Sequence, residues 1–313
     1  MNNFLFESYR ENILVSGLME LKTRFYKSLN LRQASLILIS VLLLTSCQSY
    51  RNISHKPIEG MEEGQTRELT LLTYNIRTGI GTVSPGTSPF HTQFWKKDLP
   101  RISEAIRSTG SDIIAVQELL EGQEKELGRL LGMNYAYVRH GIAGPGDWWG
   151  VGVLSKFPIS AAFRDVLSTG SGNTRSNAVV TVEINGQPHV FICIHKDKDL
   201  SDGGSIERTA DTANKFSGPV SVMGDFNLWP DDPIMSKMPG KLVDTADQVN
   251  TIGSQFLKMT GTLNGTHHPH YGRRIDSIWV DPQYYEVLDT YLMDKSHWAA
   301  SDHFGVIARV RIQ

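Results

Sequence analysis

The chain shows a series of short apolar runs that are separated by polar, glycine-rich turns. Apolar runs of this length between turn signals are typical of buried strands. We therefore expect strands at residues 69–76, 113–116, 151–154, 178–183, 189–194, 220–223, 275–280 and 304–312. The dipeptide Asn185-Gly186 joins two of these runs and is a strong signal of a hairpin turn.

Other segments have the apolar spacing of helices. Asp98–Thr109 has apolar residues at helical spacing, Pro100 falls in its first turn, and Gly110 follows as a stop signal. Helices are also expected near Gln123–Leu131 and over Glu207–Phe216. Because helices and strands intermix while hairpins are present, the sheet should be mixed or antiparallel rather than doubly wound. We expect one α/β domain over residues 67–313.

The segment before this domain has the pattern of a bacterial export signal. Its apolar stretch Leu36–Leu44 follows several basic residues and is too short for a membrane span, which needs about 20 residues. Leu44-Thr45-Ser46-Cys47 resembles a lipobox, in which Cys47 becomes the lipidated first residue. An ordinary signal with an incidental cysteine is the alternative.

The expected organisation is therefore a signal peptide with a lipobox over residues 1–47, with Met19 as an alternative start, and a polar tether over residues 48–66. The protein would be exported and anchored to a bacterial membrane through lipidated Cys47. Gln48 rather than Asp follows that cysteine, which favours the outer membrane in a Gram-negative host.

Charge and cysteine content narrow the function. The first 47 residues carry five basic and three acidic side chains, so the remaining 26 basic and 30 acidic side chains leave a net charge of −4. This balance argues against tight, stoichiometric binding of nucleic acid, but a metal-assisted nuclease stays open because an ion supplies local positive charge. The second cysteine, Cys193, lies in an apolar run and is expected to be a buried, inert thiol.

Polar side chains gather where the predicted strands end, at Asn75, Glu118, His195, Asp225, Asn227, Asp276, Asp302 and His303. Several carboxylates at one edge of a core repel one another unless a cation lies between them. Oxygen ligands without thiolates suit Mg²⁺, or alternatively Mn²⁺ or Ca²⁺, rather than structural zinc. Asp225 and Asn227 are two apart, so in an extended segment their side chains would face the same way.

Five motifs in this order resemble those of the endonuclease/exonuclease/phosphatase superfamily, which is DNase I-like, in a bacterial lipoprotein-type form. They are Thr73-Tyr74-Asn75, Gln117-Glu118, Gly224-Asp225-Phe226-Asn227, Arg274-Ile275-Asp276 and Ser301-Asp302-His303. The resemblance spans residues 69–313. It implies an α/β fold made of a two-sheet mixed/antiparallel β-sandwich flanked by helices, and a hydrolase that cleaves phosphoester bonds with a metal ion.

The resemblance also implies roles for the metal and the attacking water. Glu118 would be the principal metal ligand, with Asn75 and Asp302 beside it. Asp225 would activate or orient the water, and Asn227 would support Asp225 and contact the substrate.

The remaining implied roles concern the phosphoryl group. Asp276 would orient His303, which contacts that group, and His195 would donate to a phosphate oxygen. Arg175 is either structural or a substrate-binding residue. An acidic partner of His195 is expected as well, and Asp147 is a candidate for it.

Three functions are compatible with these residues. The first is a metal-dependent phosphodiesterase, with nuclease activity as one form. The second is a phosphoesterase of lipids or small molecules, related to sphingomyelinases or inositol phosphatases, and the third is a non-catalytic binding protein on the same fold. The expected partners are a phosphoester substrate and the membrane, without a protein partner. Trp148, Trp149 and Trp229 would stack on a base, enter a lipid interface or belong to the core.

Overall fold

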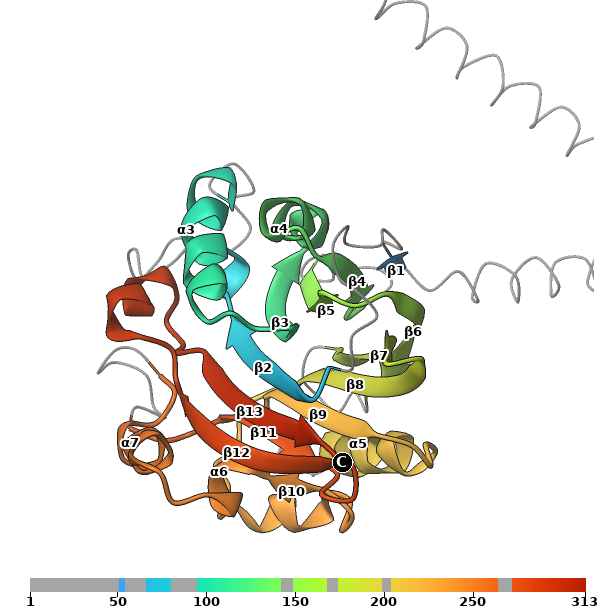
Figure 1. The fold of residues 1–313 in the computed structure, drawn as a ribbon. Coiled ribbons are helices and arrows are strands. Elements are labelled where there is room, and N and C mark those ends of the chain that lie inside the picture. The colour runs from blue at the N-terminus through green and yellow to red at the C-terminus, as the bar shows by residue number, and fades with distance from the viewer. Residues whose placement is uncertain are drawn as a thin grey trace, which may run out of the picture. The chain divides into compact units, whose positions relative to one another are not determined.

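The computed structural model describes residues 51–53, 66–79, 95–141, 149–167, 174–198, 204–263 and 272–313. Residues Tyr50–Gln313 form one compact unit, in which two β-sheets pack face to face (Figure 1). The first sheet contains, in spatial order, β1 (Arg51–Ile53), β4 (Asn134–Arg139), β5 (Trp149–Ser155), β3 (Ile113–Leu120), β2 (Glu68–Asn75), β13 (Val306–Ile312) and β12 (Tyr285–Leu292). The second contains β10 (Val243–Asp244), β11 (Asp276–Val280), β9 (Val220–Asp225), β8 (Gln187–His195), β7 (Ser176–Ile184) and β6 (Ile159–Val166).

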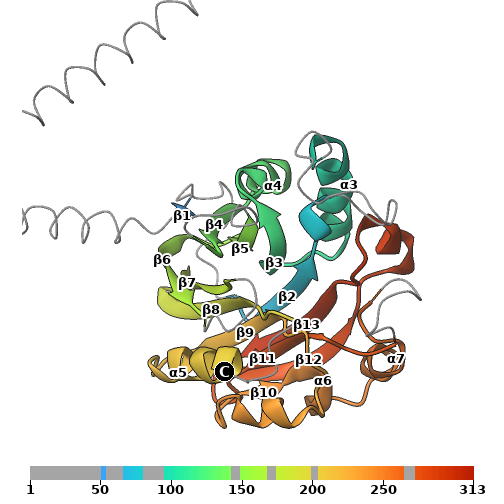
Figure 2. The same cartoon turned by 180° about the vertical axis from the view of Figure 1, so that it is seen from behind.

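Helices cover the outer faces of both sheets, as Figures 1 and 2 show from opposite sides. Apolar residues of α3 (Trp95–Ser108) and α4 (Gln123–Leu131) pack on the first sheet. α5 (Gly204–Asn214) packs on the second sheet. The short helices α6 (Thr245–Gln248) and α7 (Ile252–Thr260) contact β12, and the 3₁₀ turns are η1 (Arg77–Gly79), η2 (Pro233–Lys237) and η3 (Lys295–Ala300).

The central strands read as continuous apolar runs because both of their faces are buried. In β2, Leu69 and Leu71 pack into the core between the two sheets, whereas Leu72 and Tyr74 pack under the helices. Because side chains alternate in this way, each central strand has one apolar face toward the other sheet and one toward the helices. This arrangement confirms the predicted two-sheet, helix-flanked α/β class.

Several predicted elements differ at their ends. The predicted helix over residues 98–109 begins earlier, at Trp95, so Pro100 lies inside it rather than in its first turn. The predicted helix over residues 207–216 spans Gly204–Asn214. Lys215 and Phe216 lie beyond it because their main-chain N–H groups bond to the carbonyl three residues earlier, which closes the last turn as a 3₁₀ turn. The hairpin at Asn185-Gly186 is confirmed, since both residues have the positive φ that its turn requires, 54° and 72°.

Strands without a continuous apolar run were not predicted from the sequence. β6 and β12 lie at sheet edges and alternate between buried and exposed residues, so they carry no continuous apolar signal. Residues 51–53 of the predicted tether form β1 and pair with β4. The predicted signal peptide, Cys47 and the tether residues 48–50 and 54–65 lie outside the described residues. Among the helices that are described, none is both long and apolar enough to cross a membrane.

Candidate functional site

Strand direction brings the predicted site residues to one end of the sandwich. Each sheet contains one parallel pair, β2 with β3 and β8 with β9. Asn75 ends β2, and His195 is paired with Asp225 at the ends of β8 and β9. A hydrogen bond between the side chains of Asn75 and Asp225 shows that these ends of the two sheets meet. β11 is antiparallel and begins at the same place, with Asp276 opposite Asp225.

An irregularity in β3 directs Glu118 into this end. The pairing of β3 with β5 shifts register between Gln117 and Leu119, and Glu118 has a left-handed φ of 58°. Such a conformation costs a non-glycine residue roughly 1–2 kcal/mol, and bulges of this kind are common beside functional sites. Gln117 instead faces inward and donates to Sγ of Cys193 across the two sheets, at 3.2 Å.

Cys193 is fully buried, as predicted, and burial raises the pKa of its thiol to about 12. A thiol in this state is protonated at physiological pH, which makes it a poor nucleophile.

Asn75 links the carboxylates of the two sheets. Its Nδ2 donates to Oε1 of Glu118 at 3.2 Å and to Oδ2 of Asp225 at 3.1 Å. Its Oδ1 accepts the main-chain N–H of Arg77 at 3.0 Å, which sets the orientation of the amide. In this geometry Asn75 is a donor that holds two acids together, and its role as a metal ligand stays a prediction.

Asp302 lies near Glu118 and supplies a second oxygen-bearing group. Nε of Arg77 lies 3.2 Å from Oδ2 of Asp302, and the hydroxyl of Ser301 donates to the carbonyl of Asn75 at 2.7 Å. Burial and then the charge of Asp302 raise the pKa of Glu118. A nearby negative charge that disfavours the ionised form of Glu118 makes this position a suitable setting for a cation.

Asp276, His303 and Asp225 form a buried chain of charged groups. Nδ1 of His303 lies 2.9 Å from Oδ2 of Asp276, and its Nε2 lies 3.8 Å from Oδ2 of Asp225. Burial acts to lower the pKa of His303, but Asp276, Asp225 and Asp302 outweigh it and hold that pKa well above the usual value. Burial and then the charge of Asp276 raise the pKa of Asp225.

Two groups of residues are candidates for a metal ion. Ligand atoms of Asp225, Asp276 and His303 lie within 4.8 Å of one another, which is compact enough for an ion. However, a protonated imidazole has no lone pair to offer, and Nδ1 of His303 is already paired with Asp276. The oxygens of Glu118 and Asp302 fit a hard cation better, because a bound cation would offset the raised pKa of Glu118.

The segment after β9 turns sharply instead of continuing as a strand. Asn227 has a φ of 47°, and its main-chain N–H donates to Oδ1 of Asp225 at 2.9 Å. The side chain of Asn227 donates to the carbonyl of Lys196 at 2.8 Å. The expectation that extended geometry aligns Asp225 and Asn227 is therefore wrong, because this turn brings Asn227 back to Asp225. A side chain at Gly224 would meet the carbonyl of Ile194 at 2.0 Å, which explains the glycine.

His195 faces the same carboxylates from the other side. Its Nε2 lies 3.6 Å from Oδ2 of Asp225 and 4.0 Å from Oε1 of Glu118. Its Nδ1 is buried and has no hydrogen-bond partner within the described part of the chain. The suggested partner Asp147 lies outside the described residues.

An aromatic and basic group surrounds His195. Arg175 and Trp149 were named from the sequence as candidates for substrate contacts, whereas His140 was not. The rings of Trp149 and His140 lie 5.3 and 5.7 Å from that of His195, and the guanidinium of Arg175 lies 4.5 Å above Trp149. Burial, then Arg175, and then His140 lower the pKa of His195 well below its usual value. Arg175 is thus close enough to influence the site electrostatically. Its charge also opposes the increase in the pKa of Glu118, without outweighing burial and Asp302.

The other predicted tryptophans are placed differently. Trp229 follows Asn227 by two residues and stacks with Arg273, whose guanidinium lies 4.1 Å from the ring centre. Trp148 lies outside the described residues. Trp149 and Trp229 both pair with arginine, so neither is an isolated aromatic side chain.

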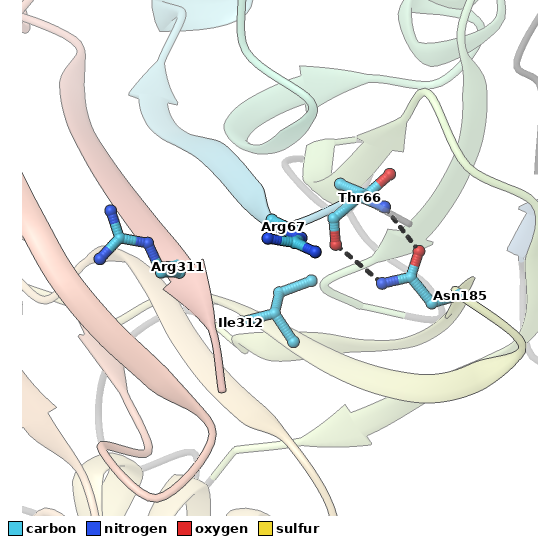
Figure 3. Close-up of a pocket in the computed structure, with 5 residues that line it drawn as sticks. All are labelled: Thr66, Arg67, Asn185, Arg311 and Ile312. Atoms are coloured by element: carbon cyan, nitrogen blue, oxygen red, sulfur yellow. Dashed lines mark hydrogen bonds between the residues drawn. The ribbon is translucent and has the colours of Figure 1, made fainter. Parts of the chain in front are cut away.

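A separate pocket lies at the opposite end of β2 (Figure 3). Thr66 and Asn185 line it and exchange two hydrogen bonds, which tie the start of β2 to the β7–β8 hairpin. Arg311, also in its lining, pairs with Glu68 and Glu286. The positive charge of Arg311 is offset by these acids. The pocket is remote from the carboxylates at the end of β2.

The comparisons with known proteins agree with this architecture. Residues 72–303 match the Endonuclease/Exonuclease/phosphatase family, and the chain belongs to that family. A comparison with curated protein sequences gives no match.

Solved structures with the same fold come from several organisms. An endonuclease/exonuclease/phosphatase from Bacteroides vulgatus has a TM-score of 0.64 at 16% identity, over 79% of this chain and 100% of that chain. A mannosyl-6-phosphatase from Bacteroides thetaiotaomicron has a TM-score of 0.57 at 22% identity, over 77% and 99% of the two chains. An endonuclease/exonuclease/phosphatase from Beutenbergia cavernae has a TM-score of 0.60 at 22% identity, over 79% and 72%.

Proposed function

We propose that the protein is an exported, lipid-anchored, metal-dependent phosphoesterase that hydrolyses phosphodiester or phosphomonoester bonds. The observation that carries this proposal is the convergence of Glu118 and Asp225 on Asn75, with Asp302 near Glu118 and His303 near Asp225. The surrounding acids hold the pKa of His303 well above its usual value. Phosphoryl transfer requires both positive charge near the phosphoryl oxygens and a group that positions the nucleophile. These residues supply both requirements.

Glu118 and Asp302 are the residues that would hold a divalent ion, with Asn75 orienting Glu118. Mg²⁺ suits these oxygen ligands, and Mn²⁺ or Ca²⁺ would fit the same donors. When bound, such an ion would stabilise negative charge on the phosphoryl and leaving oxygens.

Asp225 is suited to orient the attacking water and to take its proton. Its Oδ1 is held by the N–H of Asn227, which leaves Oδ2 facing Asn75, His195 and His303. In this arrangement His303 offers a positive charge to the phosphoryl group.

His195 and Arg175 complete the substrate contacts. Nε2 of His195 faces the carboxylates and serves as a hydrogen-bond donor, and the lowered pKa of His195 favours the uncharged ring. Arg175 adds a cation beside it, and we assign it to a non-bridging oxygen of the substrate.

The substrate class follows from charge and from what the site contains. The net charge of −4 after residue 47 favours small or membrane substrates over long nucleic acids. The similar fold of a mannosyl-6-phosphatase supports a small phosphomonoester as one substrate, and the nuclease and sphingomyelinase-like activities remain the alternatives. We expect low intrinsic sequence specificity, because neither a basic recognition helix nor an aromatic-basic stripe is visible in the sequence.

A substrate panel tests the proposal. The purified protein with Mg²⁺, Mn²⁺ or Ca²⁺ is assayed on bis-p-nitrophenyl phosphate, p-nitrophenyl phosphate, sugar phosphates, sphingomyelin, RNA and plasmid DNA. We expect hydrolysis that EDTA abolishes and that Glu118→Gln lowers by orders of magnitude without unfolding the protein. Full activity of Glu118→Gln at saturating metal would contradict the metal assignment, and inactivity on every substrate would favour a binding protein.

A second experiment tests export and anchoring. Cys47→Ser should release the protein from membranes while the activity is retained. Intact-mass analysis of the wild type should show cleavage before Cys47 and a lipid on it. An unmodified Cys47 in the mature chain would contradict the anchoring.

A further inference from the structure

Two buried histidines lie side by side next to the candidate site. His140 follows β4 and is fully buried, and its ring centre lies 5.7 Å from that of His195, with 60° between the ring planes. Trp149 contacts both rings edge to face. A buried polar ring that packs against a proposed catalytic histidine requires an explanation, because burial of an imidazole without partners is unfavourable.

The proton position on His140 is set by the main chain. Nδ1 of His140 accepts the N–H of Ser176 at 3.0 Å, so in the neutral ring the proton lies on Nε2. The carbonyl of His140 also accepts from the Ser176 hydroxyl at 2.9 Å and from Arg164 at 2.6 Å. Nε2 is thus a rigidly held donor, and it has no hydrogen-bond partner within the described ranges.

The proton position on His195 follows from its acidic neighbours. Nε2 of His195 faces Oδ2 of Asp225 at 3.6 Å and Oε1 of Glu118 at 4.0 Å. These acids favour the proton on Nε2, but both distances are too long for a hydrogen bond that would fix it there. Nδ1 of the neutral ring is then an acceptor, and it is likewise buried without a partner among the described residues. The two rings are neighbours: His140 has a donor, Nε2–H, without a partner, and His195 has an acceptor, Nδ1, without a partner among the described residues.

We infer that His140 is a positioning residue for His195. Its Nε2–H supplies Nδ1 of His195 through one bridging water and thereby keeps the His195 proton on Nε2, where it faces the phosphoryl group. A neutral donor in this position fixes the tautomer without making His195 a cation, which a carboxylate in the same place would favour. The nearby Arg175 acts in the same direction, because its charge disfavours a second cation.

Nitrogen-15 NMR of the histidine rings tests the inference without an enzyme assay. In wild type, His195 should show the Nε2–H tautomer. His140→Phe keeps a ring in the same space but removes the donor, so His195 should then populate the Nδ1–H tautomer. His140→Gln, whose amide offers a donor at a similar reach, should restore the wild-type tautomer.

His189→Phe is the matched control, because His189 is also a buried histidine but pairs with Tyr285. It should leave the His195 tautomer unchanged. An unchanged tautomer in folded His140→Phe would overturn the inference, and so would an equal shift in His189→Phe. If His140→Phe does not fold, the wild-type tautomer and His140→Gln still decide, because Nδ1–H on His195 in either would contradict the pairing.

The rate measurement rests on the proposed phosphoesterase activity. With bis-p-nitrophenyl phosphate, His140→Phe should lower kcat roughly 10-fold or more while KM changes little, since residues that orient a reacting group commonly have effects of this size. His140→Gln should recover most of that loss. A loss of rate that His140→Gln does not recover would contradict the positioning role, whereas inactivity of the wild type would count against the proposed function and leave the NMR result decisive.

Discussion

His303 and His195 approach Asp225 from opposite sides, and their surroundings differ. Nε2 of each ring faces Oδ2 of Asp225, at 3.8 Å for His303 and 3.6 Å for His195. Behind His303 lies the carboxylate of Asp276. Near His195 lie the guanidinium of Arg175 and the ring of His140. Burial lowers the pKa of both histidines, but Arg175 and His140 lower that of His195 further, whereas the acids around His303 raise its pKa.

This difference shows how one residue type provides two kinds of interaction at one phosphate site. The acid behind His303 stabilises the protonated ring, which offers charge. The neutral and basic groups beside His195 stabilise the uncharged ring, which offers a hydrogen bond without charge. The outcome is set by residues one layer behind the histidines rather than by the histidines themselves.

The largest effect is expected from Asp225, which both histidines share. Asp225→Asn removes the carboxylate that orients water and should lower kcat by roughly 10³-fold, within the range of general-base effects. The assay is hydrolysis of bis-p-nitrophenyl phosphate, with circular dichroism to establish that the variant is folded. A loss of less than about tenfold would show that neither histidine works through this residue.

The pairing of Asp276 with His303 predicts a large effect that is not additive. His303→Ala and Asp276→Asn should each lower kcat by roughly 10²-fold or more, because both remove the cation. The double variant should be little worse than His303→Ala alone. If Asp276→Asn causes its full loss in the His303→Ala background, the two residues act independently and the comparison with His195 fails.

Glutamine substitutions separate the charged role from the neutral one. His195→Gln keeps a neutral donor and should retain clearly more activity than His195→Ala. His303→Gln lacks the positive charge and should lose nearly as much as His303→Ala, roughly 10²-fold. Equal rescue of both positions by glutamine would mean that His303 does not act as a cation.

The smallest effect on catalysis is expected from His189, which contacts neither His303 nor His195. Burial lowers its pKa to about 4, from a usual value of 6.5. Between these pH values the unfolded chain binds more protons, so stability falls as the pH drops through this window. The slope from this group is at most about 1.4 kcal/mol per pH unit, or about 3 kcal/mol in total.

His189→Phe should remove this contribution and leave kcat near that of the wild type. Urea unfolding at several pH values between 4 and 7 measures it, with His189→Phe compared with wild type at each pH. The same slope in both proteins would assign the acid sensitivity to other groups. His189→Phe also loses the bond to Tyr285, so some loss of stability at neutral pH is expected.

Much of the fold and part of the site could be predicted from local sequence. The central strands were recognised because two buried faces produce continuous apolar runs, and the hairpin because Asn185-Gly186 suits a turn with positive φ. Edge strands such as β6 were missed, since their alternating exposure resembles ordinary polar sequence. Local patterns record burial, and elements that are only half buried leave a weak record.

The sequence determined which acids and histidines lie at strand ends, together with the family that their order indicates. The tertiary structure decided how they are used. It placed Asn75 as a donor between Glu118 and Asp225, and it turned Asn227 back onto Asp225. The physical reason is that hydrogen bonds and pKa shifts depend on distances between residues far apart in the chain. The 5.7 Å approach of His140 to His195 joins β4 to β8, and spacing along the sequence does not encode it.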